Sequence, residues 1–415
     1  MAGPLQGLTV LDLSRVLAGP WATQVLADFG AKVWKVERPK KGDDTRHWGV
    51  SLKDIRAKQN VNTSESIENE LGNDVSAYYL CANRGKDSIS LDITSKQGQL
   101  IIKELVKKSD IFIENFKVGN LAKYGLDYQS LKNINPKLVY CSITGFGQTG
   151  SYASQAGYDA MIQASAGLMS ITGEKGGEPQ KVGVAVADLM TGMYAVSGIL
   201  AAIHHRDKTG IGQYIDLALF DTQVGWLANQ SMDYLMTGKI PARQGTVHPS
   251  IVPYQTVESS NGKFMLAVGN DSQFAKCMEV LGLSKLVDDD KFKTNNARIE
   301  NHDELIELMT QILKSNSSEY WVAKLSKEKI PCGSINNIEQ VFEHPQIKER
   351  HTKISIKHPQ LGEIPQVANP IKFSETPIQY EKAAPTLGED SEVILKKELD
   401  YSDNEIDELK RLGVI

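Results

Sequence analysis

Cysteine is scarce in this chain, whose 415 residues include only four: Cys81, Cys141, Cys277 and Cys332. They lie far apart and form no CxxC pair, which argues against a disulfide framework and a zinc site and favours a reducing compartment. The eight histidines show no HExxH or comparable ligand spacing. We therefore expect no metal site, and a cytoplasmic location, or a mitochondrial one if the source is eukaryotic.

The chain also lacks an excess of basic residues, because its formal net charge at pH 7 is -5. Such a balance offers no surface that attracts nucleic acid or a membrane, so neither partner is expected. No apolar run approaches the roughly 20 residues needed to cross a bilayer, and no N-terminal stretch has the composition of a secretion signal. Hydrophobic residues make up 41% and charged residues 23% of the sequence, which is ordinary for a soluble globular protein.

Strand and helix patterns alternate along the first third of the chain. Residues 8–14 have the pattern of a buried strand, and residues 19–30 then predict a helix, with Pro20 in its first turn and Gly30 beyond its end. Further strands are expected at residues 31–39, 88–92, 110–116 and 138–147, and a further helix at 96–109. The alternation predicts an α/β fold with a parallel sheet, similar in its opening to nucleotide-binding folds although it lacks GxGxxG.

The remaining chain is less regular. Residues 55–75 are polar and aperiodic and predict a surface excursion. A long apolar helix is expected from Gly192 to about His205, and a second helical region over 213–238. Near residue 240 a proline-rich passage leads into a hairpin-like pair of strands, followed by helices around 303–328. The length of the chain and these changes in composition and pattern predict three segments. They are the first part of a large domain (1–225), a linker with a small domain (226–335), and a return linker that completes the large domain (336–415).

Several stretches, in order, resemble the family III CoA-transferases, the group that includes formyl-CoA transferase and the carnitine and bile-acid CoA-transferases. They are "LQGLTVLDLSRVLAGPWATQVLADFGAKVWKVERPKKGDDTRHWG", "SISLD", "IENFKVG", "LVYCSITGFGQTG", "AGYDAMIQASAGLMSITG", "VAVADLMTGMYAVSGILAA" and "PTLGEDSEVIL". The resemblance implies a Rossmann-like large domain, a smaller α+β domain, two linkers, and two ring-shaped subunits that interlock as a homodimer. It also implies acyl-CoA and a carboxylic acid as substrates, with no cofactor beyond coenzyme A as cosubstrate.

The resemblance assigns the catalytic nucleophile to Asp188, in "VAVADLMTG". A carboxylate can attack a thioester carbonyl and hold the acyl group as a mixed anhydride. An apolar surround would leave that carboxylate poorly solvated and tends to raise its pKa. On spacing alone an N-cap interpretation is favoured, because Asp188 stands just before a helical pattern. The surrounding segments favour the nucleophile.

Other positions correspond to the family's CoA contacts. The resemblance places at the CoA site Leu17, Ala18, Arg38, Leu91, Asn115, Phe116, Lys123 and Tyr158. Formyl-CoA transferase has lysine where this chain has Thr94, which puts that phosphate contact in doubt. Each of these residues could instead belong to ordinary surface or core.

Three features concern the acid substrates. Arg15 stands where formyl-CoA transferase has histidine, and an arginine can bind a second carboxylate bidentately; the alternative is a surface ion pair. Gly269, Asn270 and Asp271 fall where the family has a glycine-rich loop that closes over the covalent intermediate; the alternative is a plain turn at the end of a strand. With "HPSIVPYQ", these features look most like the succinyl-CoA:glutarate and acetyl-CoA:oxalate members, so a dicarboxylate acceptor is expected.

Two other functions are alternatives to a CoA-transferase. The racemases of the superfamily carry histidine at the position of Tyr158, and tyrosine, with an ordinary pKa near roughly 10, is a poor replacement for that base. A non-catalytic CoA-binding homologue is the second alternative, and the intact surroundings of Asp188 argue against it. The sequence therefore predicts a CoA-transferase that moves CoA from a donor such as succinyl-CoA or acetyl-CoA to a free carboxylic acid, through a covalent aspartyl intermediate.

Overall fold

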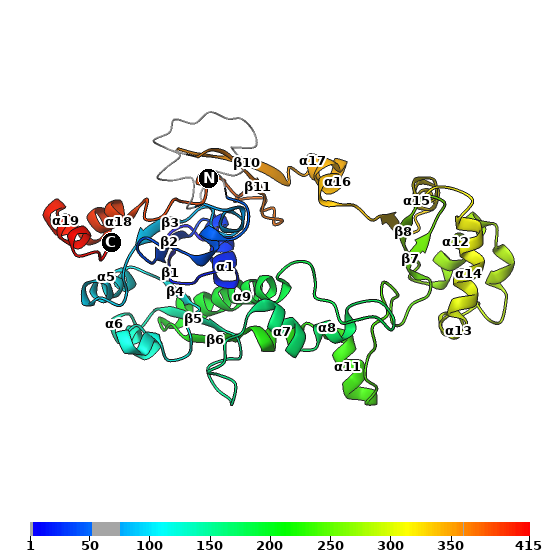
Figure 1. Cartoon of the computed structure of the whole chain (residues 1–415), viewed down its shortest axis with the longest axis horizontal. Coiled ribbons are helices and arrows are strands. Elements are labelled where there is room, and N and C mark those ends of the chain that lie inside the picture. Colours follow the sequence, from blue (N-terminus) through cyan, green and yellow to red (C-terminus); the bar gives the residue numbers. More distant parts are fainter. Residues whose placement is uncertain (1–2, 52–74, 360) are drawn as a thin grey trace. The chain divides into compact units, whose positions relative to one another are not determined.

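The computed structural model describes residues 3–51, 75–359 and 361–415. The chain divides into two compact units, each with its own core (Figure 1). Unit 1 comprises Met1–Leu168, Val182–Met232 and Glu349–Ile415, and unit 2 comprises Met169–Lys181 and Asp233–Lys348. The predicted segment boundaries near residues 225 and 335 stay predictions, and the surface excursion expected at 55–75 lies almost entirely outside the described residues.

A parallel sheet forms the centre of unit 1, which confirms the predicted α/β class. In the described part of the chain its strands are β1 (Thr9–Asp12), β2 (Lys32–Glu37), β3 (Asp87–Ser90), β4 (Ile111–Glu114), β5 (Val139–Thr144) and β6 (Tyr214–Ala218). Their order is β3-β2-β1-β4-β5-β6, and all neighbouring strands are parallel. This is the doubly wound order, in which the succession of strands reverses between β1 and β4 and ligands bind at that reversal.

The strand β6 corrects one prediction. The helical region expected over 213–238 begins instead with this strand, which pairs with β5 at the edge of the sheet. Its sequence, YIDLA, is short and mostly half-buried, so hydrogen bonding to β5 decides its structure more than its own pattern does. The helices α10 (Leu219–Gly225) and α11 (Ala228–Thr237) follow, and this part of the region is helical as predicted.

Alternate residues of each strand face opposite layers of helices. Val10 and Ile111 join the core that contains α1 (Ala18–Asp28), α7 (Asp159–Ser165), α9 (Val186–Thr209) and α10. Their neighbours Leu11 and Phe112 join the core on the other face, with α5 (Lys96–Lys107), α6 (Tyr128–Ile134), α18 (Ser391–Leu399) and α19 (Asp403–Arg411). Each face of the sheet is therefore covered, as a parallel sheet requires.

The helix α9 is longer than the sequence predicts. It begins at Val186, where the pattern predicts a start at Gly192, so Asp188 lies inside its first turn. By length and composition α9 is long and apolar enough to cross a membrane, contrary to the expectation that no apolar run approaches that length. Half of its most apolar window is buried inside the fold, and Ala195 and Ile199 pack into the core beside α1. It is the central helix of unit 1.

The last residues of the sequence complete unit 1. Ile394 of α18 and Leu409 of α19 are buried in the core beside α5. The Asp92 N–H, just beyond β3, donates to the carbonyl of Val414 at 2.7 Å. A hairpin of β10 (Lys353–His358) and β11 (Gly362–Val367) forms a smaller core with α4 (Ala77–Leu80). Segments separated by some 300 residues of sequence thus lie side by side.

Unit 2 contains an antiparallel sheet of β7 (Tyr254–Glu258), β8 (Lys263–Ala267) and β9 (Cys332–Ser334). The pair β7–β8 confirms the predicted hairpin. The helices α12 (Asp271–Leu281), α14 (His302–Leu313) and α15 (Ser318–Lys327) share its core, in agreement with the helices predicted around 303–328.

The remaining elements of the described chain, from both units, are η1 (Asp44–His47), η2 (Leu121–Tyr124), α8 (Leu168–Ile171), η3 (Ser284–Val287), α13 (Asn295–Glu300), α16 (Ile338–Glu343) and α17 (Pro345–Glu349).

Candidate active site

Two cavities open in unit 1 at the carboxyl ends of β1 and β4, where the strand order reverses. We call the one of about 490 Å³ the reaction cavity and the one of about 570 Å³ the basic cavity. Arg15, Phe116 and Asn120 line both, so the two cavities adjoin. Because Arg15 follows β1 and Phe116 follows β4, the order of the strands is what places these cavities.

The reaction cavity brings together residues that lie far apart in the sequence. The predicted site residues in its lining are Arg15, Leu17, Ala18, Asn115, Phe116, Tyr158 and Asp188. They come from the loop after β1, the start of α1, the end of β4, the start of α7 and the first turn of α9. Their individual roles stay predictions.

Asp188 is a half-buried carboxylate in this cavity. In the part of the chain that the structure describes, no hydrogen bond reaches its side-chain oxygens. Burial, followed by the negative charge of Asp159, raises the pKa of Asp188 to about 7. The direction agrees with the effect expected of a poorly solvated carboxylate, and such a group is a more basic nucleophile than an exposed aspartate.

The N-cap interpretation of Asp188 is wrong. The N-cap residue of α9 is Ala185, which has no side-chain acceptor. The N–H groups of Ala187 and Asp188 donate instead to Oδ2 of Asp159, at 2.8 and 3.3 Å. Asp159, the first residue of α7, therefore caps α9 from a distance, and the Asp188 side chain is left to line the cavity.

The loop that carries Arg15 and Leu17 is held by buried charges. Val16 between them has a φ of 70°, a left-handed conformation that is costly for a β-branched residue. Its N–H donates to both carboxylate oxygens of Asp43, at 3.2 and 3.3 Å, and Asp43 pairs with the fully buried Lys35 at 2.9 Å. Although burial acts to raise the pKa of Asp43, the Lys35 ammonium lowers it to about 2. Asp43 is therefore ionised at neutral pH and holds the strained turn.

Asp44 bridges Arg15 and Arg38, the two arginines that the family resemblance assigns to substrates. Its Oδ2 lies 2.5 Å from Nη1 of Arg15, and its Oδ1 lies 2.7 Å from Nη2 of Arg38. All three side chains are about a third to a half exposed, so each pair contributes modestly to stability. The surface ion pair considered for Arg15 is thus present, in a residue that also lines the reaction cavity.

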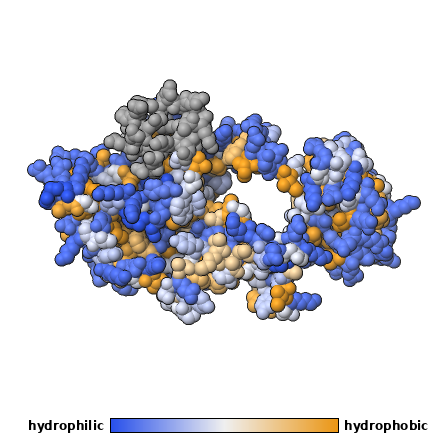
Figure 2. Space-filling view, in the orientation of Figure 1, coloured by the Kyte–Doolittle hydropathy of each residue, from blue (hydrophilic) through white to orange (hydrophobic). Residues whose placement is uncertain are grey.

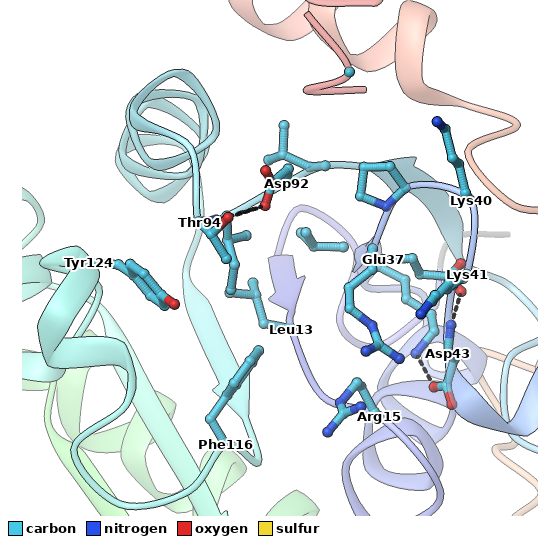
Figure 3. Close-up of a pocket in the computed structure, with 18 of the residues that line it drawn as sticks. Leu13, Arg15, Glu37, Lys40, Lys41, Asp43, Asp92, Thr94, Phe116 and Tyr124 are labelled. Carbon is cyan, nitrogen blue, oxygen red and sulfur yellow. Dashed lines mark hydrogen bonds and ion pairs between the residues drawn. The ribbon is translucent and has the colours of Figure 1, made fainter.

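The basic cavity has cations on one side and aromatic rings on the other. Figure 3 shows Lys40 and Lys41 opposite Phe116 and Tyr124. The predicted CoA residues Arg38 and Leu91 line this cavity, as does Thr94. Lysine and arginine side chains bind phosphates, and aromatic rings stack on bases. Neither lysine is among the predicted site residues, although the basic run "RPKK" directly after β2 indicates a phosphate site.

Two aromatic residues near Asp188 are also absent from the predicted site. Trp48 lines the reaction cavity, and its ring meets that of Tyr78 edge to face, with 5.6 Å between the centroids. Burial, followed by the negative charge of Asp188, raises the pKa of Tyr78 to about 12, so this phenol lies within electrostatic reach of the carboxylate. Tyr78 is on α4, a single helical turn without a periodic pattern, and no sequence signal singles it out.

The remaining predicted residues are not in the lining of either cavity. Lys123 lines neither cavity, but its ammonium donates at 3.2 Å to Oδ1 of Asn120, which lines both. Gly269, Asn270 and Asp271 belong to unit 2, where the Asn270 side chain caps α12 and Asp271 pairs with the buried Arg298 at 2.6 Å. These bonds fit the strand-end turn considered for the loop. Among the described residues, no three potential metal ligands lie together.

The chain is similar to known proteins along nearly its whole length. The family model described as CoA-transferase family III matches residues 5–391. The succinate–glutarate CoA-transferase of Agrobacterium fabrum is 47% identical over 394 residues, which cover 94% of this chain and 95% of that protein. The succinyl-CoA:glutarate CoA-transferase of Homo sapiens is 40% identical over 412 residues, with coverages of 99% and 90%. The crystal structure of a CAIB/BAIF family protein from Brucella suis is similar with a TM-score of 0.82 and 45% identity, and the match covers 96% of this chain and 100% of that chain.

Proposed function

This chain belongs to CoA-transferase family III and is a CoA-transferase, and we propose that it moves CoA from succinyl-CoA or a similar acyl-CoA to a free dicarboxylic acid through a covalent intermediate on Asp188. The observation that carries the proposal is the Asp188 carboxylate, which lines the reaction cavity with its pKa raised to about 7. The names of the two relatives support a dicarboxylate acceptor, because both contain glutarate.

Asp188 exchanges acyl groups in four steps. Its carboxylate attacks the donor thioester, the C–S bond breaks, and a mixed anhydride forms as CoA leaves as a thiolate. The thiolate attacks the aspartyl carbonyl, which releases the donor acid and leaves an aspartyl–CoA thioester. The acceptor carboxylate attacks that thioester and frees the thiolate again, and a new anhydride joins the acceptor to Asp188. The thiolate then attacks the acceptor carbonyl, so the new acyl-CoA leaves and Asp188 is restored with no net change in protons.

The oxyanions of these steps need N–H donors that are not already occupied. Asp159 takes the N–H groups of Ala187 and Asp188, so the start of α9 is not the source. The start of α1 supplies them: its N-cap Leu17 provides no side-chain cap, and both Leu17 and Ala18 line the reaction cavity. Uncapped N–H groups of a helix first turn stabilise negative charge.

The substrates bind in the two cavities. The phosphates of CoA bind near Arg38, Lys40 and Lys41 in the basic cavity, and its adenine lies against Phe116 or Tyr124. The thioester end extends past Phe116, which lines both cavities, into the reaction cavity. Arg15, at the junction, binds the second carboxylate of the acid. The reaction requires no cofactor beyond coenzyme A itself.

The active form is a homodimer in this proposal. The exposed surface of α11 supports it, because this helix exposes the large side chains of Met232, Tyr234, Leu235 and Met236. Figure 2 shows hydrophobic surface in this part of the molecule. Leu235 and Met236 are 72% and 77% exposed. Contiguous apolar surface of this kind marks association sites. A Leu235→Glu variant that stays dimeric in light scattering would remove this support.

The covalent role of Asp188 is tested by loading the protein with succinyl-CoA in the absence of an acceptor. Hydroxylamine should convert the acylated side chain to a hydroxamate on the peptide that spans residues 182–194. Asp188→Asn keeps the shape of the side chain, removes the nucleophilic oxygen, and should lower the rate by about four orders of magnitude or more. A label on Asp159, or near-normal transfer by the variant, would contradict the proposal. Exchange of the 2-position hydrogen of an acyl-CoA without transfer would favour the racemase alternative.

A further inference from the structure

The first residue of α7, Asp159, stands at the N-terminus of α9 beside Asp188. We infer that Asp159 is a positioning residue whose negative charge drives the Asp188 carboxylate toward its neutral, acylated form, while its oxygens occupy the helix N–H groups that would otherwise stabilise that carboxylate. The inference rests on the proposed covalent role of Asp188.

Three hydrogen bonds fix Asp159 in place. Its Oδ2 accepts the N–H groups of Ala187 and Asp188, at 2.8 and 3.3 Å. Its Oδ1 accepts the side-chain amide of Gln163 at 2.6 Å, one turn further along α7. Gln163 is fully buried and is itself held by the N–H of Val182, which donates to its Oε1 at 2.9 Å. Both oxygens of Asp159 are therefore directed, one to α9 and one into α7.

This arrangement removes a stabilisation that Asp188 would otherwise have. A carboxylate in the first turn of a helix is favoured by the partial positive charge of the free N–H groups. Asp159 neutralises that charge at α9 and adds a like charge next to Asp188. Two neighbouring carboxylates disfavour ionisation of one of them. The pKa of Asp188, raised to about 7 by burial and then by Asp159, has the expected direction.

Acylation relieves the repulsion. When Asp188 attacks the thioester carbonyl and the C–S bond breaks, the negative charge leaves with the CoA thiolate and the aspartyl anhydride is neutral. Asp159 then faces an uncharged group. The same repulsion returns only when the carboxylate is regenerated at the end of the cycle. Asp159 thus disfavours the free carboxylate relative to the anhydride and the thioester.

The other charged and titratable groups around Asp188 leave this role to Asp159. Asp44 is shared between Arg15 of the β1–α1 loop, at 2.5 Å, and Arg38, at 2.7 Å, so this group of three carries one net positive charge. A positive charge favours an ionised carboxylate, so this group is not what raises the pKa of Asp188. The phenol of Tyr78 on α4 is neutral at pH 7, since its pKa is raised to about 12. Tyr158 and Lys117 line the same cavity, and neither is a carboxylate that would repel Asp188. Asp159 is the charged group that raises the pKa of Asp188.

The test separates the charge of Asp159 from its hydrogen bonds. Asp159→Asn retains an oxygen that can accept from α9 and loses the charge. Asp127→Asn is the matched control, because Asp127 is the N-cap of α6 and accepts the Ser130 N–H at 3.2 Å. The titration of Asp188 is followed by carbon-13 NMR of the carboxyl groups in the protein without substrate. The acylated fraction is measured by intact-protein mass after equilibration with succinyl-CoA at pH 8.

In Asp159→Asn the titration of Asp188 should move down by about one pH unit, and the acylated fraction should fall several-fold. Asp127→Asn should change neither. The double variant Asp159→Asn, Gln163→Glu lets the new amide donate to residue 163 and moves the negative charge further from Asp188. The titration of Asp188 in this variant should therefore lie between those in the wild type and in Asp159→Asn. An unmoved titration with an unchanged acylated fraction in Asp159→Asn would overturn the inference. Failure of the wild-type protein to load Asp188 would instead overturn the proposed function, and the titration would still report on Asp159.

Discussion

Arg15 and Asn115 exchange two hydrogen bonds across the point where the strand order of the sheet reverses. The Arg15 N–H donates to Oδ1 of Asn115 at 2.9 Å, and Nδ2 of Asn115 donates to the Arg15 carbonyl at 2.7 Å. The side-chain amide thus pairs with the backbone as a neighbouring strand would, and continues the β1–β4 pairing one step beyond the sheet. Asn115 holds in place the loop that carries Arg15, Val16 and Leu17.

Asn115→Asp should therefore impair substrate binding more than stability. The variant keeps the acceptor for the Arg15 N–H but loses the donor to the Arg15 carbonyl. Leaving that carbonyl without its partner disfavours the native conformation of the loop by about 1 to 3 kcal/mol. We expect KM for succinyl-CoA to rise about tenfold, measured by initial rates. Asn135→Ala is the control, because Asn135 donates to the carbonyls of Val106 and Ser109 outside both cavities. It should lower the melting temperature and leave KM unchanged; a matching rise in KM would contradict the assignment.

Arg15→Ala should discriminate acids by their number of carboxylates. A charged hydrogen bond to a second carboxylate is worth about 1.5 to 3 kcal/mol, so KM for glutarate should rise about tenfold or more. KM for the monocarboxylate butyrate should change little. Asp44→Asn removes the ion-pair partner of Arg15 and leaves the guanidinium, so selectivity for glutarate should persist. Equal losses for the two acids in Arg15→Ala would show that Arg15 does not bind the second carboxylate.

Arg38 and Lys123 should differ in their effect on CoA binding. Arg38 lines the basic cavity and Lys123 lines neither cavity, although the family resemblance places both near CoA. Arg38→Ala should raise the Kd for CoA about tenfold in titration calorimetry, with a larger effect at low salt because the contact is electrostatic. Lys123→Ala should stay within about twofold. The reverse ranking would mean that the basic cavity is not where the phosphates bind.

Asp188→Asn should stabilise the resting protein at alkaline pH. The pKa of Asp188 is raised to about 7 in the folded state, above the ordinary 3.8, so ionisation of this group costs stability. The cost is absent below pH 4, grows between pH 4 and 7, and is complete above pH 7. The variant has no charge to bury, so its melting temperature should exceed that of the wild type by a few degrees at pH 8 and match it near pH 4. Asp221→Asn, an exposed carboxylate in the first turn of α10, should show no such pH dependence.

The fold could be predicted from the sequence where local patterns decide it. The strands at 8–14, 31–39 and 138–147 are buried runs with clear ends, and each appears in the sheet. β6 could not be identified in the same way, because pairing with β5, some 70 residues earlier, makes it a strand. The start of α9 was misplaced for a similar reason: its cap is Asp159, which precedes Asp188 by 29 residues.

The candidate site also contains residues that local sequence indicates and residues that only the fold brings there. Contiguous segments of the sequence single out Asp188, Arg15, Asn115 and Phe116 as candidates, and the structure places all four in the lining of the reaction cavity. Asp44, Trp48 and Tyr78 were missed because their relation to the site is an ion pair, a cavity wall and a ring contact formed only in three dimensions. Lys40 and Lys41 are the exception, since their basic run after a strand was readable.

The packing of α18 and α19 onto the sheet affects how the protein is made on the ribosome. Residues 349–415 are synthesised after all of unit 2, and they supply the side chains of Ile394 and Leu409 that cover one face of the sheet. Gly413 lines the basic cavity, and Val414 holds the chain beyond β3. For the several seconds that residues 349–415 take to translate, unit 1 exposes apolar strands to solvent or to chaperones, while unit 2 already has its full sequence. A nascent chain released before residue 390 should therefore aggregate through unit 1, although every residue of the reaction cavity has already been translated.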